Sequence, residues 1–182
     1  MSGVRRVIAG VSGSPGSLQA MRYAADLARA HEATLVPVLA WLPPGGEFAD
    51  RSHPSLYLRQ LWREAACHRL RQALELALGG VPDDLRCDPL VERGEAGAVL
   101  VRAASCDGDV LVVGTGRRGA ARRLLRCRVG RHCLAHARCP VIAVPPADLA
   151  RLGRGLRGWA LRHRGLSREE ALIRDVSTGQ GL

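Results

Sequence analysis

Short apolar runs alternate along this chain with segments of helical periodicity, and this alternation restricts the fold more than any other feature of the sequence. The apolar runs lie at residues 4–11, 33–41, 85–91, 110–114 and 140–144. Segments with helical spacing lie at residues 15–31, 56–78 and 96–104, and a further helix is expected before residue 140. Parallel neighbouring strands need a connection long enough to contain a helix. This order therefore predicts an α/β fold with an open, doubly wound parallel sheet flanked by helices.

Local signals predict the ends of two helices and the packing of one. Ser14 is the expected N-cap of the first helix, and Pro15 suits its first position. Gly79 and Gly80 should end the helix over residues 56–78. The inner face of that helix is expected to contain Leu61, Ala65, His68, Leu70, Ala73, Leu74 and Leu78.

The strand segments differ in ways that predict their places in the sheet. Residues 110–114 and 140–144 are continuously apolar, which is typical of strands covered on both faces. Residues 85–91 are less apolar, which favours the sheet edge. Pro37 should remove one hydrogen-bond donor from the second strand. After Pro43-Pro44-Gly45-Gly46, the chain is expected to form a loop up to about residue 54.

Length and composition indicate one folded domain with an appended tail. The chain has 182 residues, of which 47% are hydrophobic and 24% charged, as in ordinary globular proteins. It shows no apolar run long enough to cross a membrane and no secretory signal, so we expect a cytoplasmic protein without a membrane partner. We expect the domain to cover residues 1–146. Residues 147–182 are expected to form a basic tail, partly helical or disordered.

The cysteine and histidine patterns favour neither a metal site nor a disulfide framework. The six cysteines contain no CxxC pair, and we expect them to be small buried hydrophobes. His132 and His136 lie four residues apart near Cys139, but no fourth ligand stands at a suitable spacing, so no metal site is predicted. Ser12 and Ser14 have no identifiable base, and a nucleophile elbow is absent, so the chain is not expected to be an enzyme.

Four segments in order resemble the universal stress protein A family over about residues 4–145. They are R-R-V-I-A-G-V-S-G-S-P-G-S at 5–17, L-V-E-R-G-E-A at 90–96, D-V-L-V-V-G-T-G at 109–116 and H-A-R-C-P-V-I-A-V at 136–144. The resemblance implies a five-stranded parallel sheet in the order 3-2-1-4-5. It also implies a role in the stress response and a homodimer formed through the last strand.

The ATP-binding branch of that family carries a glycine pattern after the fourth strand, from which this chain departs. Gly114 matches the first glycine, whereas Arg117, Cys127 and Arg128 stand at the second glycine, the third glycine and the hydroxyl position. Glycines there let backbone amides approach phosphate oxygens closely. Ser12 replaces the family's aspartate. By this resemblance, ATP is a possible cofactor, and the candidate nucleotide-binding residues are Val11, Ser12, Ser14, Ala40, Gly114, Arg117, Cys127, Arg128 and Val129.

Seven arginines occupy residues 117–131, in a chain of formal net charge +10 whose 27 basic residues are all arginine. Guanidinium groups bind phosphate oxygens well, so a second candidate site for anions contains Arg118, Arg122, Arg123, Arg126 and Arg131. We expect a noncatalytic stress-response module that binds an unidentified protein partner. The alternatives are an ATP-binding switch with an arginine-adapted phosphate loop and a nonspecific polyanion- or nucleic-acid-binding protein.

Overall fold

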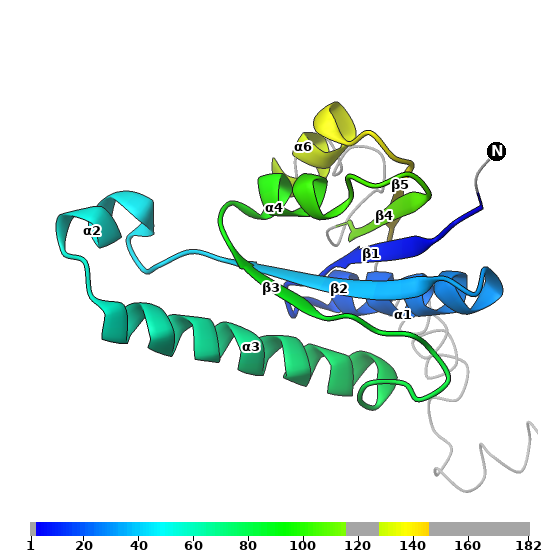
Figure 1. Ribbon diagram of the computed structural model, residues 1–182, viewed down its shortest axis with the longest axis horizontal. Coiled ribbons are helices and arrows are strands. Elements are labelled where there is room, and N and C mark those ends of the chain that lie inside the picture. The colour runs from blue at the N-terminus through cyan, green and yellow to red at the C-terminus, as the bar shows by residue number, and fades with distance from the viewer. Residues whose placement is uncertain (1–2, 116–127, 146–182) are drawn as a thin grey trace, which may run out of the picture. The chain divides into compact units, whose positions relative to one another are not determined.

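A computed structural model describes residues 3–115 and 128–145 of the chain, and its centre is an all-parallel sheet of five strands (Figure 1). The strands are β1 (Arg6–Gly10), β2 (Thr34–Trp41), β3 (Leu90–Arg93), β4 (Asp109–Gly114) and β5 (Val141–Val144). They lie in the order β3-β2-β1-β4-β5. The predicted doubly wound fold and its strand order 3-2-1-4-5 are therefore confirmed.

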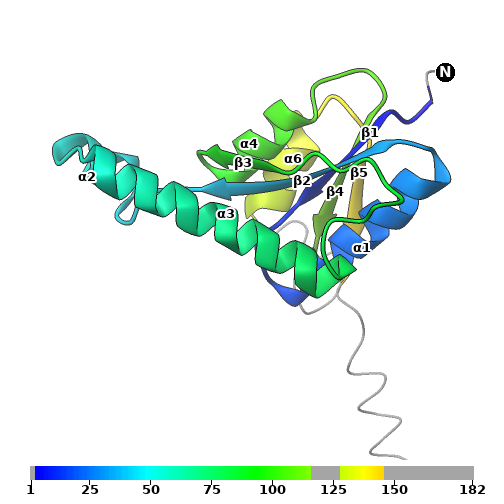
Figure 2. The same ribbon diagram turned by 60° about the horizontal axis from the view of Figure 1, so that its bottom comes forward.

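Helices cover both faces of the sheet (Figures 1 and 2). The first layer contains α1 (Pro15–Ala30) and α3 (Leu56–Leu78), and the second contains α4 (Ala96–Ala103) and α6 (Arg128–His136). A further helix, α2 (Gly46–Ser52), follows β2 at the carboxyl end of that strand. In the part of the chain that the structure describes, no helix is long and apolar enough to cross a membrane.

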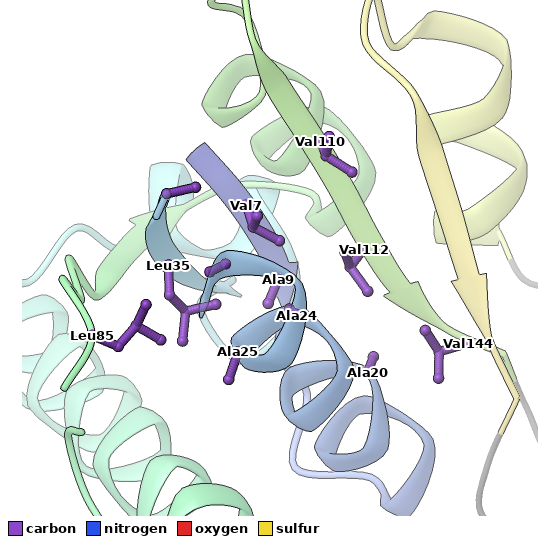
Figure 3. Packing of buried hydrophobic residues seen from close by; sticks show 12 residues of the cluster. Val7, Ala9, Ala20, Ala24, Ala25, Leu35, Leu85, Val110, Val112 and Val144 are labelled. Atoms are coloured by element: carbon purple, nitrogen blue, oxygen red, sulfur yellow. The ribbon is translucent and has the colours of Figure 1, made fainter. Parts of the chain in front are cut away.

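The layer under the sheet is packed with small side chains from α1 (Figure 3). Ala20, Ala24 and Ala25 of α1 have no exposed surface and face a sheet surface that includes Val7 and Val112, which are equally buried. Alanine adds little bulk to a helix, so α1 approaches the sheet closely. Both ends of α1 lie where the sequence predicts them. Ser14 is the N-cap and Pro15 the first helical residue, and the helix ends at the residue before His31.

Prolines explain why β3 is shorter than expected. The strand predicted at residues 85–91 begins only at Leu90, and before it Cys87 makes a single bridge with Leu35 of β2. Pro89 has no N–H to donate and interrupts the ladder between these two places. Pro37 is buried opposite Ala9 of β1, and the continuous pairing of β2 with β3 starts only at Val38. The predicted edge position of this strand is confirmed.

Two expectations about residues 42–78 are wrong. Part of the expected loop forms the helix α2. The bounds of α3 match the prediction, and Gly79 ends it with a φ of 77°, but its inner face is rotated from the expected one. The residues of α3 that are buried are Ala66, Leu70, Ala73 and Leu74. Leu61, Ala65 and His68, which were expected to face inward, are exposed.

The cysteines are less uniformly buried than expected. Cys133 is buried in the core under α6, Cys67, Cys87 and Cys139 are half-buried, and Cys106 is exposed. Burial raises the pKa values of the Cys87 and Cys139 thiols above their usual range, which favours the unreactive neutral thiol.

Candidate functional site

The carboxyl ends of β1 and β4 form the switch point of this sheet. These strands are adjacent and parallel. The helix α1, which follows β1, covers one face of the sheet, whereas α6, the next described helix after β4, covers the other face. In open α/β sheets the switch point is the place where ligands bind.

Strand register brings four of the predicted site residues together at this edge. The pairing of Ala9 with Val112 places Val11 level with Gly114, and the pairing of Gly10 with Val38 places Ser12 level with Ala40. Val11 is buried and donates its N–H to the Val38 carbonyl, whereas Ala40 is half-buried. The register thus places these residues at the same edge of the sheet, and their role in binding stays a prediction.

The serine-rich loop after β1 forms several hydrogen bonds within itself. The Ser12 N–H donates to Ser17 Oγ (3.2 Å), and the Ser17 N–H donates to Ser14 Oγ (3.3 Å). The Ser17 hydroxyl in turn donates to the Ser14 carbonyl (2.9 Å), and the hydroxyls of Ser12 and Ser14 share a hydrogen bond of 3.0 Å. The first turn of α1 therefore uses these donors within the loop.

Two glycines let the end of β4 lie against the first turn of α1. A Cβ atom on Gly114 would lie 2.5 Å from the Gly16 backbone carbon and oxygen and 2.8 Å from the Ser17 nitrogen. A Cβ on Gly16 would lie 2.9 Å from the Thr115 carbonyl oxygen. Both contacts involve backbone, which cannot rotate away as a side chain can. Gly114 is thus required for packing, whether or not a phosphate binds near it.

The arginine-rich segment is only partly described. Arg128 and Val129 lie in the first turn of α6, where Arg128 is exposed and Val129 is half-buried, and Arg131 is exposed one turn further on. The other predicted residues of this segment, Arg117, Arg118, Arg122, Arg123, Arg126 and Cys127, lie outside the described residues. Arg128 lies one turn before His132, which packs against Gly97 in the first turn of α4. Because α4 begins directly after β3, the start of α6 lies near the carboxyl ends of the strands.

Thr115, which the sequence does not single out, joins the end of β4 to β5 through hydrogen bonds. Its side chain is 1% exposed, and its hydroxyl donates to the Val144 carbonyl of β5 (3.3 Å), which also accepts the Thr115 N–H at 2.8 Å. A threonine directly after an apolar strand gives no clear sign of such a contact in the sequence.

A second missed feature is an ion cluster beside the carboxyl ends of β2 and β3. The Asp50 side chain is 1% exposed and accepts hydrogen bonds from Arg59 Nε (2.9 Å) and from an Arg93 NH₂ group (2.7 Å). Arg93 also donates to both oxygens of Glu47, and its guanidinium lies 5.8 Å from the ring centroid of Trp41. The cluster joins α2 to α3 and to the sheet.

These contacts change the acidity of two carboxyl groups. The hydrogen bond from Arg59, followed by that from Arg93, holds the pKa of Asp50 below its usual range. The hydrogen bond from Arg93 does the same to the pKa of Glu47. In both cases the guanidinium partners stabilise the charged carboxylate, so the cluster is ionised at neutral pH.

The two histidines of α6 pack against each other. Their rings are stacked with centroids 4.3 Å apart, and His136 Nδ1 lies 2.9 Å from the His132 carbonyl oxygen. Within residues 3–115 and 128–145, no group of three or more histidine, cysteine, aspartate or glutamate side chains is placed to hold a metal ion.

The comparison with known protein families gives one match over most of the chain. The sequence model of the universal stress protein family matches residues 3–145. The chain belongs to this family. The match covers both strands of the switch point and the serine loop between β1 and α1. No curated protein matches the chain.

Several solved structures are similar to this chain. The universal stress protein UspA from Lactobacillus plantarum is 16% identical and has a TM-score of 0.57, over 79% of this chain and 99% of that one. The protein MJ0577 is 12% identical with a TM-score of 0.58, over 81% and 99%. A universal stress protein crystallised in complex with cAMP is 22% identical with a TM-score of 0.48, over 80% and 100%. The first two likenesses show a common fold.

Proposed function

We propose that this universal stress protein is a noncatalytic cytoplasmic module of the stress response that binds protein partners without requiring a nucleotide. The observation that carries this proposal is the hydrogen bonding within the serine loop. The N–H groups of Ser12 and Ser17 already donate to serine hydroxyls. A phosphate at the start of α1 would have to compete for these donors.

Crowding at the same edge supports this proposal. The Gly16 and Gly114 backbones lie against each other, so the end of β4 and the first turn of α1 leave no room between them at that point. Beyond it, Arg117, Cys127 and Arg128 replace the residues through which the ATP-binding branch approaches phosphate with its backbone. Unlike glycine, these residue types carry side chains that hinder a close approach of backbone to phosphate.

The hydroxyl groups of the serine loop support a noncatalytic role. Ser12 and Ser14 bond to each other, and Ser14 also caps α1. A serine nucleophile needs an adjacent base and an oxyanion site. In the described part of the chain, the hydrogen-bond partners of these two hydroxyls are serine groups alone.

The edge strand β5 supports homodimer formation. It pairs with β4 on one side and carries the apolar sequence Val141–Val144, of which three residues are half-buried. An apolar edge strand is a ready template for pairing with a second chain. A homodimer through β5 would continue the sheet across the two-fold axis and cover these side chains.

An ATP-binding switch is the second candidate function, and Arg128 favours it. This exposed arginine stands in the first turn of α6, at the edge where ligands of such sheets bind. Its guanidinium can make charge-assisted bonds to phosphate that replace missing backbone donors. Binding of a longer polyanion through Arg131 and the neighbouring arginines would use the same chemistry without a defined stoichiometry.

Titration with ATP by isothermal calorimetry tests the proposal, after a check that no nucleotide co-purifies with the protein. We expect no saturable heat at millimolar ATP. Saturable binding near one ATP per chain, abolished by Arg128→Ala and retained by the control Arg69→Ala on α3, would establish the switch instead. Binding that disappears as salt is raised would indicate a polyanion site. Gly114 is unsuitable for this test because its replacement disturbs packing.

A further inference from the structure

Helix α3 has a second apolar stripe that residues 3–115 and 128–145 leave exposed. The stripe, called here the outer seam, contains Leu58, Leu61, Ala65, His68, Gln72 and Leu76. All six are exposed, and Leu58, Leu61 and Leu76 keep 39%, 47% and 58% of their surface. The outer seam lies away from the inner face, which packs on the sheet through Ala66, Leu70, Ala73 and Leu74.

The spacing of the outer seam is that of a helix-pairing surface. From Leu58 to Gln72 its members follow one another at alternating intervals of three and four residues, as in the seam of a coiled coil. The next position of that repeat is the exposed Glu75, and Leu76 lies beside it. The outer seam contains no charged residue, although charged residues such as Glu64 and Arg71 stand beside it. A solvated helix face is normally rich in charges, so an uncharged seam with three exposed leucines indicates a partner.

We propose that the outer seam binds the outer seam of a second copy of this chain, with the two α3 helices antiparallel. In this arrangement Ala65 lies opposite His68 of the partner, and Leu61 lies opposite Gln72 of the partner. Leu58 lies near Leu76 of the partner. The central layer then combines the small Ala65 with the larger His68, and the layer of Leu61 with Gln72 combines side chains of similar size. A parallel pair would instead place Ala65 opposite Ala65 and His68 opposite His68. The alanine layer would then contain a cavity, and the histidine layer would be overpacked.

Charge complementarity supports the antiparallel order. With the layers aligned as above, Glu64 flanks the seam directly opposite Arg71 of the partner, and the two-fold axis repeats the pair. Both side chains are exposed, and Glu64 accepts a hydrogen bond from the equally exposed Gln60 (2.7 Å). The antiparallel helices also oppose their macrodipoles favourably.

The size of the contact predicts a weak, reversible dimer. The outer seam extends over about 27 Å at 1.5 Å per residue, and a strip of helix surface of that length covers on the order of 500 Å² per partner. A standard interface buries about 800 Å² per partner, so dissociation in the micromolar range is expected. The α3 helix packs on β2 and β3, at the opposite end of the sheet from β5, so this contact does not compete with pairing through β5.

Sedimentation equilibrium of the full chain, from low to high micromolar concentration, tests the proposal. We expect reversible association that Leu61→Arg and Glu64→Arg each weaken about tenfold or more, because one removes seam packing and the other opposes two arginines. The control Asp83→Arg replaces an exposed acidic residue away from the seam and changes the net charge by as much as Glu64→Arg does. It should leave association unchanged. Circular dichroism melts check that each variant folds.

Charge-swap variants decide the orientation. Glu64→Arg combined with Arg71→Glu should restore association to within about threefold of the parent chain, because the opposed pair is rebuilt in reverse. Glu64→Arg combined with Arg69→Glu should not, since Arg69 would meet Glu64 only in a parallel pair. Rescue through Arg69, association insensitive to Leu61→Arg, or a chain that stays monomeric at high micromolar concentration would each overturn the proposal.

Discussion

Replacing Gly114 with alanine should destabilise the fold by about 2 kcal/mol, within the range for overpacking a close-packed interior. The new Cβ would lie 2.5 Å from the Gly16 backbone carbon, whereas carbon atoms in contact prefer about 3.5–4 Å. The first turn of α1 must therefore move by about 1 Å, away from the contact it makes with β4. For a domain of this size the loss lowers the melting temperature by roughly 4–8 °C.

Gly10→Ala provides the matched control at the end of the neighbouring strand. A Cβ on Gly10 would lie 3.0 Å from Leu100 Cδ1, which is the end of a flexible side chain and not backbone. Its cost should be under about 1 kcal/mol. Urea unfolding of both variants, followed by circular dichroism, measures the difference. Equal stability of the two variants, or a loss below about 0.5 kcal/mol for Gly114→Ala, would refute the reasoning from backbone contact.

The other contacts predict further measurable changes. Ser14→Ala should lower the free energy of unfolding by about 1 kcal/mol and Ser14→Gly by only a few tenths, because alanine removes the N-cap of α1 whereas glycine is tolerated there. Urea unfolding compares the two variants, and equal losses would contradict the capping role. Acid should loosen the packing of α2, because the folded state lowers the pKa values of Asp50 and Glu47. These two carboxylates stabilise the folded state fully above pH values near 4. Their contribution to the free energy of unfolding is lost as the pH falls through the lowered pKa values. The fluorescence of Trp41, beside Arg93, should report this transition, and Arg93→Gln should diminish it; a transition unaffected by that variant would count against the cluster.

Elements with strong local signals could be predicted closely from the sequence. The bounds of α3 follow from the Gly79 stop, and the interior strands follow from apolar residues that must be covered on both faces. The start of β3 differs from the prediction because Pro89 interrupts the ladder, an effect that the apolar character of residues 85–91 does not reveal. The family resemblance supplied the strand order, which periodicity alone does not determine.

Contacts between distant segments could not be predicted in the same way. Helix α3 carries two apolar stripes, and periodicity alone does not say which one faces the sheet, so Leu61 and His68 were placed inside. The pairing of Asp50 with Arg93 spans 43 residues. The contact between Gly16 and Gly114 depends on how closely α1 approaches β4, which no local pattern encodes.

Hydrogen exchange of the backbone amides at the start of α1 tests the central claim most directly. The Ser12 and Ser17 amides should be protected in the nucleotide-free protein, since each donates to a serine hydroxyl, and millimolar ATP should leave their exchange rates unchanged. The account would be contradicted if these two amides exchanged fast in the free protein and slowly after ATP is added. That result would show that the amides are unbonded in the free protein and donate to a phosphate of the nucleotide.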